Sequence, residues 1–210
     1  MNSHNENARI EAFSDGVFAI AITLLILEIK VPPVESVHSS AELWCALTHL
    51  WPSFFAFGLS FMMILINWVN HHSALKCIDK SSPQFMYVSG FYLLTVVVLP
   101  FPTALMAEYL QTPFAQPAVV FFMFISTIAN IAWIVLLASM QKPVMLAKDS
   151  QAEQVLKNGL RLSLYGLPIY ASLTVLAWWF PLTVLILNTI LWFGWLIIGL
   201  TYHKVEGKES

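Results

Sequence analysis

The chain has 210 residues, of which 58% are hydrophobic and only 10% are charged, and its formal net charge is −2. Because a soluble domain usually carries about 25% charged residues, this composition indicates an integral membrane protein. The slightly negative balance excludes a broadly basic surface for nucleic acid. At roughly 25 to 35 residues for each spanning helix and its loop, the chain has room for about six transmembrane helices. We therefore expect one all-α transmembrane domain over residues 1–210.

Apolar segments alternate with short polar or proline-containing breaks along the whole chain. Residues 1–8 are polar and are expected to be disordered. The pattern then predicts six helices, over about 9–31, 41–72, 84–106, 117–140, 160–180 and 182–202. The polar interval 141–158 predicts a short helix at the membrane interface.

Prolines mark several of the predicted helix boundaries. Pro32 and Pro33 should end the first helix, because proline lacks a backbone N–H and cannot continue the hydrogen-bond ladder. Pro52 should kink the second helix near its start. Pro100 and Pro102 should distort the end of the third.

The basic residues predict the orientation of the helices. Six crossings place both termini on one side of the membrane, and nine of the ten Lys and Arg residues then fall on that side, with Lys30 alone opposite. By the positive-inside rule both termini are cytoplasmic, in a multi-pass protein of the cell (inner) membrane. Since the charge asymmetry was not used to count the helices, it supports six crossings over five or seven.

The first predicted helix is unusual for a lipid-facing segment. Its uncharged run, Gly16 to Leu27, has twelve residues, which cover roughly 18 Å of a hydrocarbon core about 30 Å thick. If the helix crosses the bilayer, Asp15, together with Arg9 or Glu28, lies at or near membrane depth. Charges are tolerated there only where they face protein or water.

An apolar stripe runs along the same helix, spaced at i, i+3, i+4, i+7 and i+11: Ile20, Thr23, Leu24, Leu27 and Val31. Such a stripe is typical of helix packing in a core. The alternative is a pore lining, in which several subunits contribute the same face around an axis and rings of Ile and Leu narrow the ion path. The periodicity leaves both interpretations open.

Polar residues gather where the first helix begins and the second ends. The first group is Arg9, Ser14 and Asp15, and the second is Asn67, Trp68, Asn70, His71 and His72. The helix macrodipole favours Asp15 near a helix N-terminus, and an indole or imidazole N–H could satisfy its lone pairs. The alternative is that Ser14 and Asp15 only cap the helix while the histidines lie at the membrane interface.

Other chemistries find less support in the sequence. A metal site from His71, His72, Asp15 and Asp79 is disfavoured, because adjacent histidines point about 100° apart on a helix. No hydrolase, metalloprotease or P-loop motif is present, so we predict neither an enzyme nor a bound cofactor. The alternative function is a small membrane transporter, proton-coupled or other, that uses Asp15 and His71 or His72 as a titrating relay. A third alternative is a structural subunit that transports nothing.

Two stretches resemble a known family. Arg9-x-x-x-Phe13-Ser14-Asp15, followed by the segment Gly16 to Ile29, resembles the transmembrane protein 175 family of potassium channels, and Trp68-Val-Asn-His-His72 is similar to the matching helix end. The single six-helix unit resembles the prokaryotic members rather than the two-repeat animal form. The resemblance implies a homotetramer in which four copies of the first helix line the ion path, without a carbonyl filter loop.

The resemblance also implies roles for single residues. Ile20 matches the narrowest constriction of the pore, Leu24 and Leu27 match further apolar layers, and Thr23 lies where a hydroxyl can help partly dehydrated potassium ions pass. Permeating potassium would then lie near Ile20 and Thr23, while other monovalent cations or protons stay open as permeants.

The signature residues have a different implied role, which is to anchor the first helix against the polar end of the second: Arg9, Phe13, Ser14 and Asp15. Glu28 departs from the family pattern, which also has Asp at this position. The expected partners are the lipid bilayer, three further copies of the chain and the permeant ion.

Overall fold

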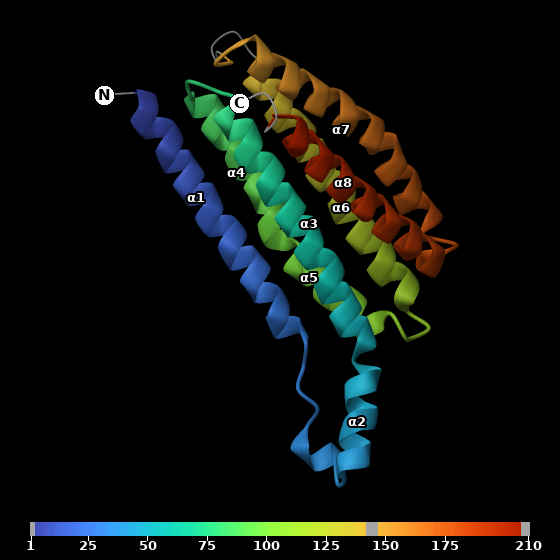
Figure 1. Cartoon of the computed structure of the whole chain (residues 1–210). Helices are drawn as coiled ribbons and strands as arrows, with labels where there is room; N and C mark the ends of the chain where they lie inside the picture. The colour runs from blue at the N-terminus through green and yellow to red at the C-terminus, as the bar shows by residue number, and fades with distance from the viewer. Residues whose placement is uncertain (1–2, 142–146, 207–210) are drawn as a thin grey trace.

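The computed structural model describes residues 3–141 and 147–206, with side chains described over 7–141 and 147–199. Within these residues the secondary structure is helical apart from one isolated bridge between Ile78 and Ala147. Figure 1 shows the elements in chain order: α1 (Ser3–Leu24), η1 (Leu25–Glu28), η2 (Val34–Ser36), α2 (Ser40–His49), α3 (Trp51–Lys76), α4 (Pro83–Val98), α5 (Pro100–Tyr109), α6 (Ala115–Met140), α7 (Ser150–Leu176) and α8 (Pro181–Glu206).

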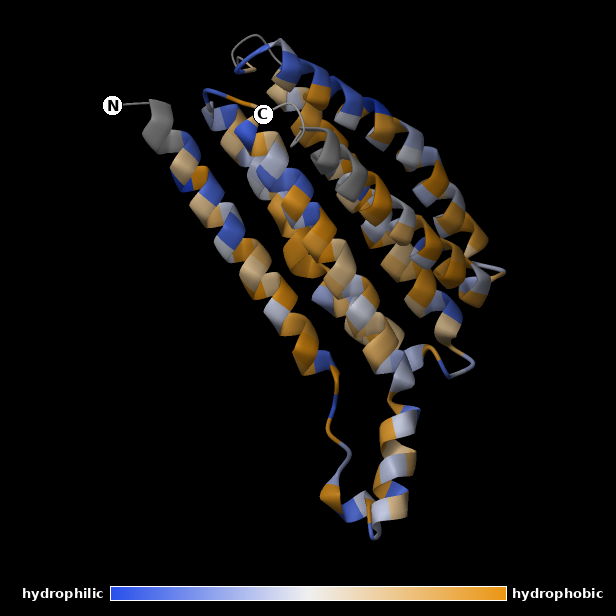
Figure 2. Cartoon of the chain, in the orientation of Figure 1, coloured by the Kyte–Doolittle hydropathy of each residue, from blue (hydrophilic) through white to orange (hydrophobic). Residues whose placement is uncertain are grey.

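The long helices run side by side as a bundle. α1 lies at one edge against α3 and α4, and α6, α7 and α8 form the other side. α1 begins, α3 ends, α7 begins and α8 ends at the same end of the bundle, which we call the polar end (Figure 1). Hydrophilic residues gather on α3 and on the first half of α7 near this end (Figure 2). α2 extends beyond the bundle at the opposite end.

The expected proline breaks are present. The second predicted helix is divided at Leu50 into α2 and α3, with Pro52 in the first turn of α3. The third is divided at Leu99 into α4 and α5, and Leu99 keeps helical dihedrals (φ −57°, ψ −35°). Because Pro100 lacks the N–H that would continue the hydrogen-bond ladder, the helix is interrupted there, although residues 83–109 still form one apolar segment long enough to cross a membrane.

The first helix differs from its predicted bounds at both ends. α1 begins at Ser3, so the expectation that residues 1–8 are disordered is wrong from Ser3 onward. It ends at Leu24 and tightens into the 3-10 turn η1, after which Ile29 is extended (φ −85°, ψ 98°). Pro32 disfavours helical backbone at Val31, but the helix already ends before that predicted residue.

The predicted interfacial helix within 141–158 is wrong where the structure describes it. Residues 142–146 lie outside the described residues, and from Ser150 the chain forms α7 without interruption to Leu176. Asp149 starts this helix early, because its Oδ1 accepts a hydrogen bond from the Ala152 N–H at 2.7 Å. An ion pair between Glu153 and Lys157, one turn apart, supports the same turns.

Five helical segments of the described chain are long and apolar enough to cross a membrane, namely 7–28, 51–76, 83–109, 115–140 and 181–199. α7 is a further long helix that runs beside α6 and α8 (Figure 1), although its polar first half keeps it outside that set. The prediction of an all-helical, multi-pass membrane protein is therefore confirmed. A count of six crossings stays a prediction.

Candidate functional site on the first helix

The inner face of α1 is fully covered by its own chain. Ser14, Phe18, Ala21 and Leu25 follow one another at intervals of three or four residues and are at most 2% exposed. They face α3, α4 and the α5 side of the bundle. The Phe18 ring lies 5.5 Å from the ring of His71, centroid to centroid. One face thus attaches α1 to the rest of the subunit.

The outer face of α1, continued by η1, carries the predicted stripe as far as Leu27, and the described residues leave it exposed, whereas Val31 lies beyond the helix. Ile20 and Leu27 are 62% and 61% exposed, and Leu24 is 40% exposed. The Thr23 hydroxyl donates to the backbone oxygens of Ala19 and Ile20, both at 2.9 Å. Because its proton is used by the helix, the lone pairs of this oxygen remain available at the surface.

A row of polar contacts joins α1 to the end of α3. The Asn7 side-chain amide donates to the Ile78 carbonyl at 3.3 Å. His72 Nδ1 lies 3.0 Å from Glu11 Oε1. The Trp68 indole N–H donates to Asp15 Oδ1 at 2.8 Å. We call these three contacts the polar ladder: its α1 members recur every fourth residue, so they lie on one side of the helix.

Two of the ladder residues on α3 support each other. The rings of Trp68 and His72 stack with their centroids 5.9 Å apart and their planes at 24°. The Glu11 and His72 side chains are 35% and 30% exposed, and their contact has the distance of an ion pair without the alignment of a hydrogen bond. The Asp15 to Trp68 hydrogen bond is therefore the best-formed step of the ladder.

Sequence reasoning missed Asn7 and Glu11. The available signal was the four-residue spacing of polar side chains at 7, 11 and 15. Ser14 and His71 were predicted to lie in the same region, and they are 0% and 1% exposed at this interface. The ring of His71 stacks on Tyr92 with a centroid distance of 5.6 Å. Neither Ser14 Oγ nor His71 Nε2 has a hydrogen-bond partner among the described residues.

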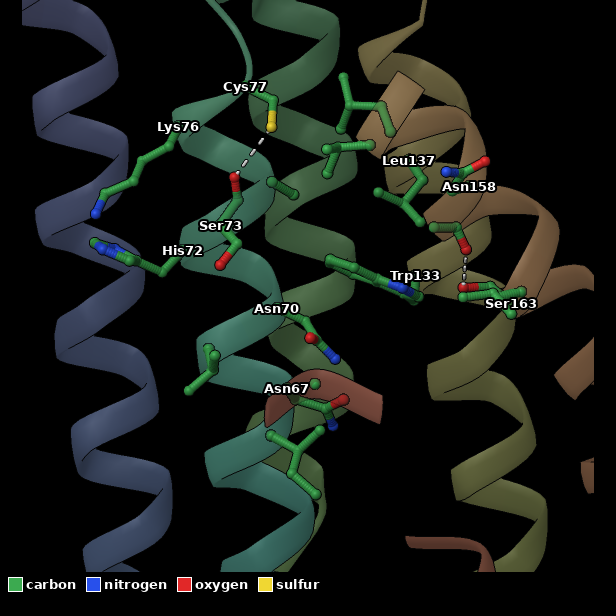
Figure 3. A pocket seen from close by; sticks show the side chains of 18 of the residues that line it. Asn67, Asn70, His72, Ser73, Lys76, Cys77, Trp133, Leu137, Asn158 and Ser163 are labelled. Carbon is green, nitrogen blue, oxygen red and sulfur yellow. Dashed lines mark hydrogen bonds between the residues drawn. The ribbon is translucent and has the colours of Figure 1, made fainter. Parts of the chain in front are cut away.

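Other predicted signature residues lie away from the ladder. Arg9 and Phe13 share the outer face with Ile20, since seven or eleven residues bring a helix back to nearly the same side, and Phe13 is 64% exposed. Both border a groove between α1 and α4. Asn70 projects from α3 away from α1 (Figure 3). Within a single chain, these three side chains do not join the expected anchor.

The contacts bear on the relay and metal interpretations as well. Asp15 accepts from Trp68, whose indole N–H does not titrate, and the described part of the chain shows no hydrogen bond from His71 or His72 to Asp15. No group of three or more His, Cys, Asp or Glu side chains over the described residues is arranged to hold a metal ion. Asp79, which the sequence offered as a metal ligand together with Asp15, His71 and His72, is exposed.

Comparison with known proteins finds relatives of this chain. The family model described as "Endosomal/lysosomal potassium channel TMEM175" matches residues 9–100. A potassium channel of Chamaesiphon minutus is 53% identical over 114 residues, covering 54% of this chain and 56% of that protein. A potassium channel of Streptomyces collinus is 49% identical over 107 residues, covering 51% of this chain and 50% of that one. The aligned part of the chain thus spans about half the length of these curated relatives.

The structural match extends over nearly the whole chain. A crystal structure of a lysosomal potassium-selective channel TMEM175 homologue from Chamaesiphon minutus aligns with a TM-score of 0.84 and 34% sequence identity, over 93% of this chain and 98% of that one. The family match covers α1 from Arg9 onward and the end of α3, so it includes every contact of the polar ladder except that of Asn7. The chain belongs to the TMEM175 family.

Proposed function

We propose that this protein is a potassium-preferring cation channel whose ion path is lined by α1 from four subunits. The observation that carries the proposal is the apolar outer face of α1, which is unpartnered in the single chain while the inner face is fully packed. The matched relatives, which are named as ion channels rather than enzymes, support it.

Lipid is a less suitable partner than a second subunit for this face. Arg9 and the Thr23 hydroxyl lie on it, and the apolar run between Asp15 and Glu28 is short. A charge and a hydroxyl cost less free energy beside water or protein than in hydrocarbon. Four copies related by a rotation axis would bring the outer faces together around a narrow path.

Each stripe residue then has a role. Ile20 forms the narrowest ring, where close apolar side chains restrict water and ions, and Leu24 and Leu27 form further apolar layers. Thr23 presents hydroxyl oxygens to a partly dehydrated potassium ion between these rings. No resident cofactor is proposed, and potassium is the transported substrate.

The proposed subunit crosses the membrane six times. Five of the crossings are the apolar segments given above, and α7 is the sixth. Its termini lie in the cytoplasm, because Arg9 near the start of α1, Lys76 at the end of α3 and Lys148 just before α7 belong to the polar end, whereas Lys30 follows η1 at the opposite end. The protein would lie in the cell (inner) membrane. The proton-coupled carrier has less support, because Asp15 meets an indole rather than a histidine.

Potassium flux into liposomes containing the purified protein tests the proposal. Ile20→Ala should widen the ring of Ile20 side chains, and Ile20→Asn should let water enter it. Both variants should therefore raise the potassium flux or relax its selectivity. Ile186→Ala is the matched control, because Ile186 on α8 is 61% exposed against 62% for Ile20 but lies outside the proposed path. Unchanged flux in both Ile20 variants would overturn the constriction, and absence of flux in the unaltered protein would overturn the channel.

A further inference from the structure

A second candidate site lies on the side of α3 that faces away from α1. A cavity of about 680 Å³ opens between α3, α6, α7 and α8. This volume falls in the range of about 300 to 1,000 Å³ in which small-molecule sites are found. The proposed channel function assigns no role to this cavity.

The cavity is lined by neutral polar side chains. Asn67 and Asn70 project from α3 on the side of Trp133, and Asn158 and Ser163 approach from α7 (Figure 3). His72 and Lys76 also border the cavity, but their side chains turn toward α1 in the same view. Lys148 and Asp149 border the cavity as well, and their opposite charges leave this part of the lining without net charge. A charged ligand would therefore lack a balancing charge, and burial of an uncompensated charge is costly.

Aromatic rings form the wall, and two buried polar atoms in it lack partners. Trp192 is 7% exposed, and its indole Nε1 has no hydrogen-bond partner among the described residues. Asn130 Oδ1 likewise has none, while its Nδ2 is turned toward Gly166 of α7, 3.7 Å from where a Cβ would lie. A buried N–H and a buried carbonyl without partners favour a ligand that supplies one acceptor and one donor.

We propose that this cavity binds a neutral, planar aromatic compound that carries a carboxamide or an equivalent donor and acceptor pair. The ring stacks among Trp133, Trp192 and Trp195. The carboxamide oxygen accepts from Trp192 Nε1, and its NH₂ donates to Asn130 Oδ1. Because a carboxamide holds both groups, it can also pair with Asn130 if that side-chain amide is turned over.

Calorimetric titration of the full chain in lipid nanodiscs tests the proposal, with heats from empty nanodiscs subtracted. The probes are 2-naphthamide, 2-naphthoate and 2-methylnaphthalene, which share one ring system and differ in charge and hydrogen bonding. We expect saturable binding of 2-naphthamide and weaker or no saturable binding of the other two. A cavity that only water fills would show no saturable 2-naphthamide signal, and equal binding of 2-naphthoate would contradict a neutral site. Either result overturns the proposal.

Conservative variants locate the site. Trp192→Phe keeps a ring and removes the N–H, and Asn130→Leu removes the carbonyl, so each should weaken 2-naphthamide binding about three- to tenfold. Trp44→Phe on the protruding α2 and Gln84→Leu on α4 are the controls, because both side chains are exposed and lie outside the cavity. Unchanged affinity in both cavity variants would overturn the assignment. Because binding is measured without ion flux, failure here and failure of the channel proposal are separate results.

Discussion

The two faces of α1 differ in what covers them. The inner face is packed against α3 and α4 and is reinforced by the polar ladder, whereas the outer face carries an apolar stripe that the described part of the chain leaves uncovered. The same helix therefore has one side that packs into the fold and another that the described residues leave exposed. The same substitution should therefore change different properties at adjacent residues on the two faces, namely stability on the inner face and ion flux on the outer face.

Leu24 and Leu25 make the sharpest pair, because they are neighbours with 40% and 0% exposure. Leu25→Ala should lower the stability of the subunit by roughly 2 kcal/mol, since packing contacts are lost in the interior. Leu24→Ala should leave stability nearly unchanged and instead alter potassium flux. Thermal unfolding in detergent and liposome flux measure the two effects. Equal destabilisation by both variants would contradict the division between the faces.

Asp15 tests the ladder that holds the inner face. Asp15→Ala removes the acceptor of the Trp68 indole N–H and should cost about 1.5 kcal/mol, which should lower the yield of assembled protein more than it changes ion selectivity. Asp15→Asn keeps an acceptor oxygen and should retain most of the assembly, while Asp79→Ala, at an exposed carboxylate, is the control. Size-exclusion chromatography reports the assembled fraction. Normal assembly of Asp15→Ala with altered selectivity would assign Asp15 to the ion path instead.

Thr23 tests the outer face without changing its shape. Thr23→Val replaces the hydroxyl by a methyl group of similar size, so stability should be unchanged. Loss of the hydroxyl oxygens should remove about 1 kcal/mol of stabilisation from a passing potassium ion. The potassium permeability of the variant should therefore be roughly fivefold lower than that of the unaltered protein. Thr23→Ser should behave nearly as the unaltered protein in ion-substitution flux. A Thr23→Val variant with unchanged permeability would show that the hydroxyl does not face the ion.

The Glu11 to His72 contact should give the smallest effect. Both side chains are about a third exposed, and ion pairs of that kind contribute less than about 1 kcal/mol because water and salt screen them. Glu11→Gln should therefore shift thermal unfolding only slightly, and added salt should reduce the shift further. A loss as large as that of Asp15→Ala would mean that the ladder acts as one coupled unit.

Local sequence patterns predicted the helices well where prolines and polar loops mark the ends. Pro52 and Pro100 produce breaks close to the expected positions, because a missing N–H acts locally whatever packs around it. The region around Asp149 was misjudged. An N-cap and an i,i+4 ion pair begin α7 well before its apolar part, and hydropathy does not register such contacts.

The candidate site was predicted in part. The spacing predicted one continuous stripe from Ile20 to Val31. Ile20, Thr23 and Leu24 are exposed on α1 and Leu27 is exposed on η1, but Val31 lies beyond the helix. Asn7 and Glu11 were missed, and Arg9 and Phe13 were expected in the anchor but share the outer face. A sequence motif brings together residues that are close in the chain. Their contacts depend instead on the side of the helix from which each side chain projects and on the helix that packs against that side.

The sequence by itself determined the class of protein, the approximate helices and the existence of a stripe on α1, because hydropathy, prolines and the 3.6-residue period act within single segments. Only the tertiary structure decided which face of α1 is covered and which polar residues meet across α1 and α3. It also decided that a cavity lies behind α3, where Trp192 Nε1 and Asn130 Oδ1 have no hydrogen-bond partner among the described residues. These features depend on contacts between residues distant in the chain. Periodicity shows that a helix has two faces but does not identify the partner of either.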